Sequence, residues 1–109
     1  MALKHANAGD IVDLSPLGSR LKDTKTAAII KSEAFEAVRL VVRAGATIPT
    51  HHVPGPITLH GLEGRAVISV SGAEVELKSG DWLYLEGGEP HSVRGIEDSS
   101  ILLTIIFAD

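Results

Sequence analysis

Short apolar segments separated by glycine-containing turns follow one another at an even spacing through the second half of the sequence. The segments are residues 57–62, 65–70, 73–77, 82–85, 92–94 and 101–107. The turns between them include Glu63-Gly64, Ser71-Gly72, Ser79-Gly80 and Gly87-Gly88. Short strands at this spacing, with no helical pattern between them, are typical of an antiparallel β-sandwich or barrel. The sequence therefore predicts an all-β fold.

The first half of the chain is expected to add a hairpin to this fold. Residues 26–31 and 37–43 are apolar and rich in β-branched side chains, and a polar connection, Ser32-Glu33-Ala34, joins them. The alanines of 26–31 would also suit a helix, but the segment is too short for a stable one and lacks a cap. The two segments are therefore interpreted as paired strands.

The residues before this hairpin are expected to form an arm. Residues 11–14 (Ile-Val-Asp-Leu) could form a short edge strand, and residues 15–21 a turn or a single helical turn, because a serine and a proline are followed at once by a glycine. A chain of 109 residues can bury one core. We therefore expect a single domain, with an N-terminal arm or edge segment at 1–25 and the barrel at 26–109.

The amino-acid composition limits which metals and which macromolecular partners are expected. The chain has no cysteine, so a metal could be held only by nitrogen and oxygen. A net charge of -4, with ten scattered Lys and Arg residues, argues against nucleic acid. No signal peptide or membrane-length apolar run is visible, so a soluble cytoplasmic protein without a membrane partner is expected. Residues 101–107 are apolar at nearly every position, which favours cover on both faces and hence a homodimer.

Histidines flank two of the predicted strands. His51 and His52 lie in the proline-rich segment 49–56, and His91 follows the glycine bend at 87–88. Imidazoles that converge from separate segments can hold a transition metal, and nitrogen ligands suit zinc, copper, nickel or iron better than calcium or magnesium. The three histidines are therefore candidate metal ligands.

Strand parity limits which histidines can reach one ion. Adjacent residues of a regular strand point to opposite faces, so His51 and His52 share a ligand only if segment 49–56 leaves strand geometry. The prolines of that segment would allow this departure. His60 is a fourth candidate, but it lies three residues from Ile57, and parity turns it away from the side that Ile57 faces.

The order of these residues resembles the two motif regions of the cupin family, and most closely the small single-domain cupins of uncharacterised function. The resemblance covers roughly residues 38–107. It implies a double-stranded β-helix, or jelly-roll barrel, which is often dimeric and holds a divalent metal such as zinc, nickel, iron, manganese or copper near one mouth. The residues that carry the resemblance are Gly45, Pro49, His51, His52, Ile57 to Gly64, Gly80-Asp81, Gly88 and His91.

The two motifs fit unequally. In the second, Gly80 opens the motif, Gly88 is the bend glycine and His91 stands at the ligand position, while Glu86 replaces a usual proline and Gly95 a usual asparagine. In the first motif, the second histidine position falls on His52. The first histidine position and the glutamate position are occupied by Thr50 and Ile57.

Two functions follow from this combination. The first is a cupin whose barrel pocket holds a divalent metal through His51, His52 and His91, and whose metal acts as a Lewis acid on a small carboxylate or carbonyl compound. The second is a metal-free module that binds or senses a small molecule, which Ile57 favours because it makes the pocket drier. A purely structural dimer is a third, weaker interpretation.

No catalytic residue is identified from the sequence. Glu63, Glu86 and Glu89 are either solvated turn residues or acids and bases at the barrel mouth. Trp82 and Tyr84 alternate along one strand and are interpreted as core or interface residues. Neither a nucleophile elbow nor a phosphate-binding loop is visible.

Overall fold

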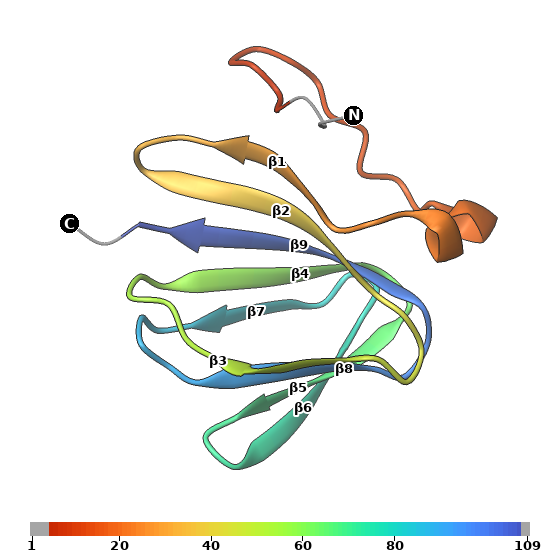
Figure 1. The fold of residues 1–109 in the computed structure, drawn as a ribbon, viewed down its shortest axis with the longest axis vertical. Coiled ribbons are helices and arrows are strands. Elements are labelled where there is room, and N and C mark those ends of the chain that lie inside the picture. The colour runs from red at the N-terminus through yellow and green to blue at the C-terminus, as the bar shows by residue number, and fades with distance from the viewer. Residues whose placement is uncertain (1–4, 108–109) are drawn as a thin grey trace.

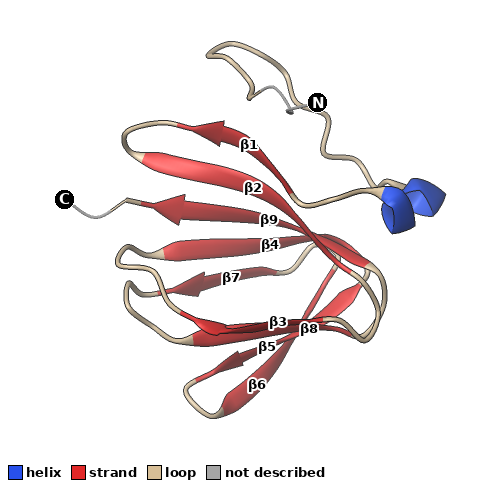
Figure 2. Ribbon diagram, viewed as in Figure 1, coloured by secondary structure: helices blue, strands red, loops and turns tan. Residues whose placement is uncertain are grey.

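Nine strands and one short 3-10 helix make up residues 5–107, which are the residues that the computed structural model describes (Figures 1 and 2). The first four residues of the predicted arm and the last two of the predicted barrel lie outside them. No helix in residues 5–107 is long and apolar enough to cross a membrane. The elements are η1 (Gly18–Asp23), β1 (Ala27–Lys31), β2 (Phe35–Val42), β3 (Thr47–His51), β4 (Ile57–Glu63), β5 (Arg65–Val70), β6 (Ala73–Lys78), β7 (Trp82–Leu85), β8 (His91–Gly95) and β9 (Ser99–Ile106).

The strands form two antiparallel sheets that face each other across the core. The five-stranded sheet has the order β1-β2-β9-β4-β7 and the four-stranded sheet the order β3-β8-β5-β6. Figure 2 shows the two sheets as the upper and lower walls of a barrel. The all-β jelly-roll predicted from the sequence is confirmed.

Alternation along the strands fills the barrel. In β4, Ile57 and Leu59 are buried while Thr58 and His60 are only half-buried, as expected of a strand with one face on the core. Directly paired residues on neighbouring strands point to the same face of the sheet, so the partner of a buried residue also faces the core. The buried core consists of Val42, Ile57, Leu59, Ala66, Ile68, Leu77, Leu85, Val93 and Ile101.

The two ends of the barrel differ. The arm carries η1 beside one end, where Leu21 is buried and the Glu63 carboxylate accepts hydrogen bonds from the backbone N–H groups of Leu17 and Gly18. At the other end, on the left of Figure 1, β3 and β9 finish and β2, β4 and β8 begin. We call this second end the histidine end, because His51 and His91 lie there.

In the first half, the structure has one strand that was not predicted and lacks one that was. Residues 47–51 form β3 although Pro49 lies within them. β3 lies at the edge of its sheet and pairs only with β8, and an edge strand tolerates a proline because one row of its N–H groups needs no partner. The edge strand expected at 11–14 was wrong. The Arg39 guanidinium donates to the carbonyl oxygens of Leu14 and Ser15, so a side chain takes the place of a strand ladder at the end of that segment.

Candidate functional site

Two of the predicted histidines meet at the histidine end of the barrel. His51 is the last residue of β3 and His91 the first residue of β8, and the two are cross-strand partners. Their ring centroids lie 4.4 Å apart with an interplanar angle of 57°. His91 is only 4% exposed, whereas His51 is exposed. Segments 40 residues apart in sequence therefore contribute one imidazole pair.

A bulge in β3 creates this pair. Ile48 is opposite Val93, but the next paired residue, His51, is opposite His91, so three steps along β3 match two along β8. The extra residue of a bulge resets the alternation of side chains. His51 consequently faces His91, which without the bulge it would not have done.

Local hydrogen bonds orient both rings. The Nδ1 atom of His51 lies 3.0 Å from the carbonyl oxygen of Pro49, and the Nδ1 atom of His91 lies 3.0 Å from that of Glu89. Because a carbonyl oxygen only accepts, each Nδ1 must carry the hydrogen, and each neutral ring has its lone pair on Nε2. Within residues 5–107 neither Nε2 atom makes a hydrogen bond. Neither Nε2 atom is thus committed to a partner among these residues.

The two imidazoles that meet are too few ligands for a typical transition-metal site. Structural zinc sites use four protein ligands and catalytic sites typically three. No group of three or more His, Asp or Glu side chains in the part of the chain that the structure describes is arranged to hold an ion. His52 is exposed just beyond β3, so of the three predicted ligands the structure brings two together. His52 as a third ligand stays a prediction.

The side chains of His60 and Ile57 lie on opposite faces of β4, as strand alternation predicts. Ile57 is buried in the core, while His60 is paired with Leu102 and Trp82 on the opposite, outer face of the five-stranded sheet. His60 is therefore separated from the imidazole pair by the sheet itself. The aliphatic Ile57 lies at the start of β4, at the histidine end.

A small cavity of about 280 Å³ lies at the same end of the barrel. Glu36 is its one charged lining residue. The rest of its wall is apolar side chain and loop backbone, from Val53, Pro54, Gly55, Ile105, Ile106 and Phe107. Val53 lies two residues beyond His51, so the loop that leaves the imidazole pair also forms this wall. We call this space the rim cavity.

The glycine bend before His91 holds that loop in place. The Gly88 N–H donates to the carbonyl oxygen of Val53 at 2.8 Å. At Gly87, an added Cβ would lie 2.2 Å from the carbonyl oxygen of Pro54, so a larger residue could not approach as closely. The second motif thus supplies His91 and also supports the loop that forms part of the cavity wall.

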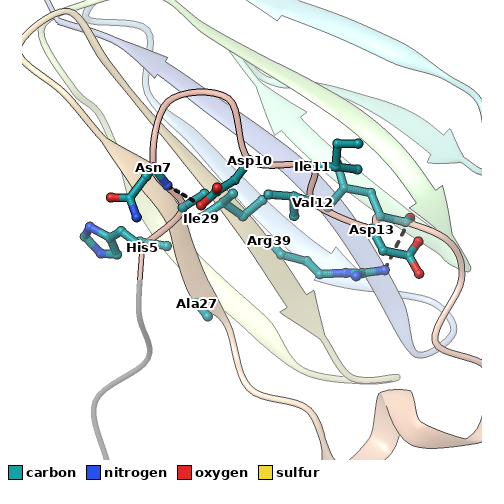
Figure 3. Close-up of a pocket in the computed structure, with 12 residues that line it drawn as sticks. His5, Asn7, Asp10, Ile11, Val12, Asp13, Ala27, Ile29 and Arg39 are labelled. Atoms are coloured by element: carbon teal, nitrogen blue, oxygen red, sulfur yellow. Dashed lines mark hydrogen bonds between the residues drawn. The ribbon is translucent and has the colours of Figure 1, made fainter.

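A larger cavity of about 760 Å³ lies elsewhere, between the arm and β1 (Figure 3). Its polar lining includes Asp10, Asp13 and Arg39. The Nη2 atom of Arg39 donates to carbonyl oxygens of the arm, while its buried Nε has no partner within residues 5–107. Asp13 accepts from Ser15, which is also in the arm. This cavity lies away from the imidazole pair, and of its charged groups Arg39 is the one that attaches the arm to the barrel, since Asp10 and Asp13 bond within the arm.

The remaining residues singled out from the sequence take structural places. Glu63 anchors the arm, Glu89 accepts a hydrogen bond from the Ser71 hydroxyl at 2.8 Å, and Glu86 is exposed. Trp82 and Tyr84 are exposed on the outer face of the five-stranded sheet. Sequence reasoning missed the inward-facing Glu36, because only the pairing of β2 with β9 shows which face it occupies.

Comparison with known proteins agrees with this architecture. The family model described as Cupin domain matches residues 38–107. A search of curated proteins finds no match. Among solved structures, a conserved protein of unknown function from Streptococcus pyogenes superposes with a TM-score of 0.79 at 17% identity, covering 100% of this chain and 96% of that one.

Two further structures are similar. A cupin superfamily protein from Desulfitobacterium hafniense has a TM-score of 0.78 at 18% identity, with 99% of this chain and 100% of that chain covered. The DMSP lyase DddQ from Ruegeria pomeroyi has a TM-score of 0.69 at 24% identity, with 87% and 52% covered. At these identities the likeness is one of fold.

Proposed function

The chain belongs to the cupin family, and on that premise we propose that it is a metal-free module that binds a small, largely apolar organic molecule at the histidine end of the barrel. The observation that carries the proposal is the oriented imidazole pair at the same end of the barrel as the rim cavity, whose wall includes Val53, two residues beyond His51. The two Nε2 atoms supply polar recognition, and the rim cavity supplies apolar contact, a combination that typical ligand sites share.

The imidazoles would recognise the polar part of the ligand. With Nδ1 committed to a carbonyl oxygen, each neutral ring accepts a hydrogen bond at Nε2 from a ligand hydroxyl or N–H group. When a ring gains a proton, the same atom becomes a donor. His91, being almost fully buried, would lose little side-chain entropy on binding.

Metal-dependent catalysis is the function that this proposal replaces. DMSP lyase DddQ shares the fold, as does a salicylate 1,2-dioxygenase from Pseudaminobacter salicylatoxidans. In this chain a metal would have two converging imidazoles, and the position of the family's carboxylate ligand is held by Ile57. Two ligands are fewer than a catalytic zinc site uses.

Thermal unfolding against two panels tests the proposal. One panel holds small organic metabolites and the other zinc, nickel, iron, manganese and copper ions, and the proteins are the wild type and the His91→Ala and His60→Ala variants. A ligand present at 100 times its Kd stabilises the fold by about 2.7 kcal/mol, which raises Tm by roughly 10 °C or more in a domain of this size.

We expect an organic compound to raise Tm in the wild type and in His60→Ala, which alters the outer face, but not in His91→Ala. A metal-induced rise that His91→Ala abolishes would instead identify a metal site. Failure of every organic compound to shift the wild type would overturn the proposed function.

A further inference from the structure

Glu36 occupies an unusual place for a carboxylate. It pairs with Ile105 of β9, which in turn pairs with Ile57 of β4, and directly paired residues share a face. Ile57 is buried in the core, so Glu36 faces the inside of the barrel. Every other inward-facing residue of β2, namely Val38, Leu40 and Val42, is apolar.

In the part of the chain that the structure describes, the Glu36 carboxylate has no ion-pair partner. Among residues 5–107, Glu36 forms neither a hydrogen bond from its side chain nor an ion pair. Its cross-strand partner on β1 is Lys31, yet the two form no salt bridge and Lys31 is exposed. Glu36 is half-buried and lines the rim cavity, where apolar groups replace part of its hydration.

Backbone N–H groups next to the cavity do not replace the missing partner of the Glu36 carboxylate. The N–H of Ile106 donates to the carbonyl oxygen of Pro56 at 2.9 Å, and the N–H of Phe107 donates to that of Ala34 at 2.9 Å. These two N–H groups at the end of β9 are therefore already hydrogen-bonded and do not donate to the Glu36 carboxylate. A charged group in an apolar space gains most from a partner of opposite charge that enters with the ligand.

We propose that the ligand of the rim cavity is a small organic cation, a primary ammonium on a short apolar body, whose charge pairs with Glu36. This inference rests on the proposed ligand-binding function and names its ligand class. A metal cation would need several oxygen ligands, whereas the cavity offers one carboxylate within apolar walls. An ammonium needs only one such partner, and its hydrocarbon part would contact Val53 and Ile105.

The test compares three compounds of similar shape and different charge: benzylamine, benzyl alcohol and benzoate. Binding is followed at neutral pH by chemical-shift titration of the backbone amides, with Val53 and Ile105 as reporters of the rim cavity. The variant is Glu36→Gln, which keeps the shape of the side chain. The matched control is Glu33→Gln, in the exposed turn between β1 and β2.

We expect the wild type and Glu33→Gln to bind benzylamine about tenfold or more tightly than benzyl alcohol, and benzoate most weakly. In Glu36→Gln the preference for the amine should disappear while the binding of the alcohol remains. A Val53→Trp variant, which fills the cavity, should weaken all three compounds.

Equal affinity of the three compounds for the wild type would overturn the inference, as would an amine preference that survives Glu36→Gln or no binding of benzylamine at all. None of these results would affect the proposed function, which depends on the broader organic panel and on His91.

Discussion

At the scale of single residues, Asp81 shows how one carboxylate fixes a turn of the barrel. Its Oδ2 atom accepts a hydrogen bond from the Lys78 backbone N–H at 2.9 Å, and the Lys78 ammonium lies 3.1 Å from the same atom. The backbone N–H, and then the Lys78 side chain, hold the pKa of the Asp81 carboxyl below its ordinary value. The Gly80-Asp81 pair that opens the second motif therefore closes the connection from β6 to β7.

This lowered pKa predicts a pH dependence of stability. A carboxyl whose folded-state pKa is depressed stabilises the fold above its unfolded pKa, about 3.9 for Asp, and loses that contribution as pH falls through the lower folded-state pKa. We expect the urea midpoint of the wild type to fall between pH 5 and pH 3, and to fall less steeply in Asp81→Asn.

The control for this measurement is Asp23→Asn, because the Asp23 carboxylate makes no hydrogen bond within residues 5–107 and should leave the slope unchanged. The same pH slope in Asp81→Asn as in the wild type would show that Asp81 contributes nothing to acid stability.

At the scale of elements, the arm is attached to the barrel through β4. The Glu63 carboxylate at the end of β4 accepts from the N–H of Leu17 at 2.7 Å and from that of Gly18 at 3.1 Å. The Ser100 hydroxyl on β9 donates to the same carboxylate at 3.4 Å. These bonds place η1 so that Leu21 is buried. A polar residue of a turn sequence thus has a structural use that its local context did not indicate.

Removing this carboxylate should detach the arm. We expect Glu63→Ala to lower the free energy of unfolding by about 1–3 kcal/mol, because two backbone donors lose their acceptor. Trypsin should then cleave faster after Arg20 and Lys22, which are exposed on η1. Glu86→Ala, which removes an exposed carboxylate, is the control and should change neither quantity. Unaltered cleavage in Glu63→Ala would mean that the arm is held by other contacts.

At the scale of the whole molecule, the outer face of the five-stranded sheet exposes several large apolar side chains. Trp82 is 62% exposed, Tyr84 51% and Ile106 39%. Strand alternation and register place all three on the side of the sheet away from the core. Large contiguous apolar patches are uncommon on monomers, and a two-fold axis would let one such patch cover its copy.

We therefore predict a homodimer that buries this outer face. Trp82→Glu should shift the protein from dimer to monomer in sedimentation velocity at micromolar concentration. The reason is that dimer formation would bury the introduced carboxylate in an apolar interface without a partner of opposite charge. Val75→Glu, which alters a 43% exposed residue of β6 in the other sheet, should leave the dimer intact. A wild type that sediments as a monomer would contradict the prediction.

Local pattern was enough to predict much of the fold. Strand alternation correctly placed His60 on the face of β4 opposite to Ile57, and the structure shows that the Ile57 face is the buried one. Turn glycines marked most strand ends, because a positive φ angle is available to glycine at little cost. These are properties of a residue and its near neighbours, so the amino-acid sequence alone determined them.

Pairing between distant strands decided the rest. No strand was assigned to residues 47–51 from the sequence, and the edge position of β3 is what makes a strand that contains Pro49 favourable. The choice of His51 rather than His52 as the partner of His91 depends on a bulge between β3 and β8, and the inward direction of Glu36 depends on its register with β9. A shift of one residue in either pairing would reverse the face of each side chain, so the site was decided by tertiary structure.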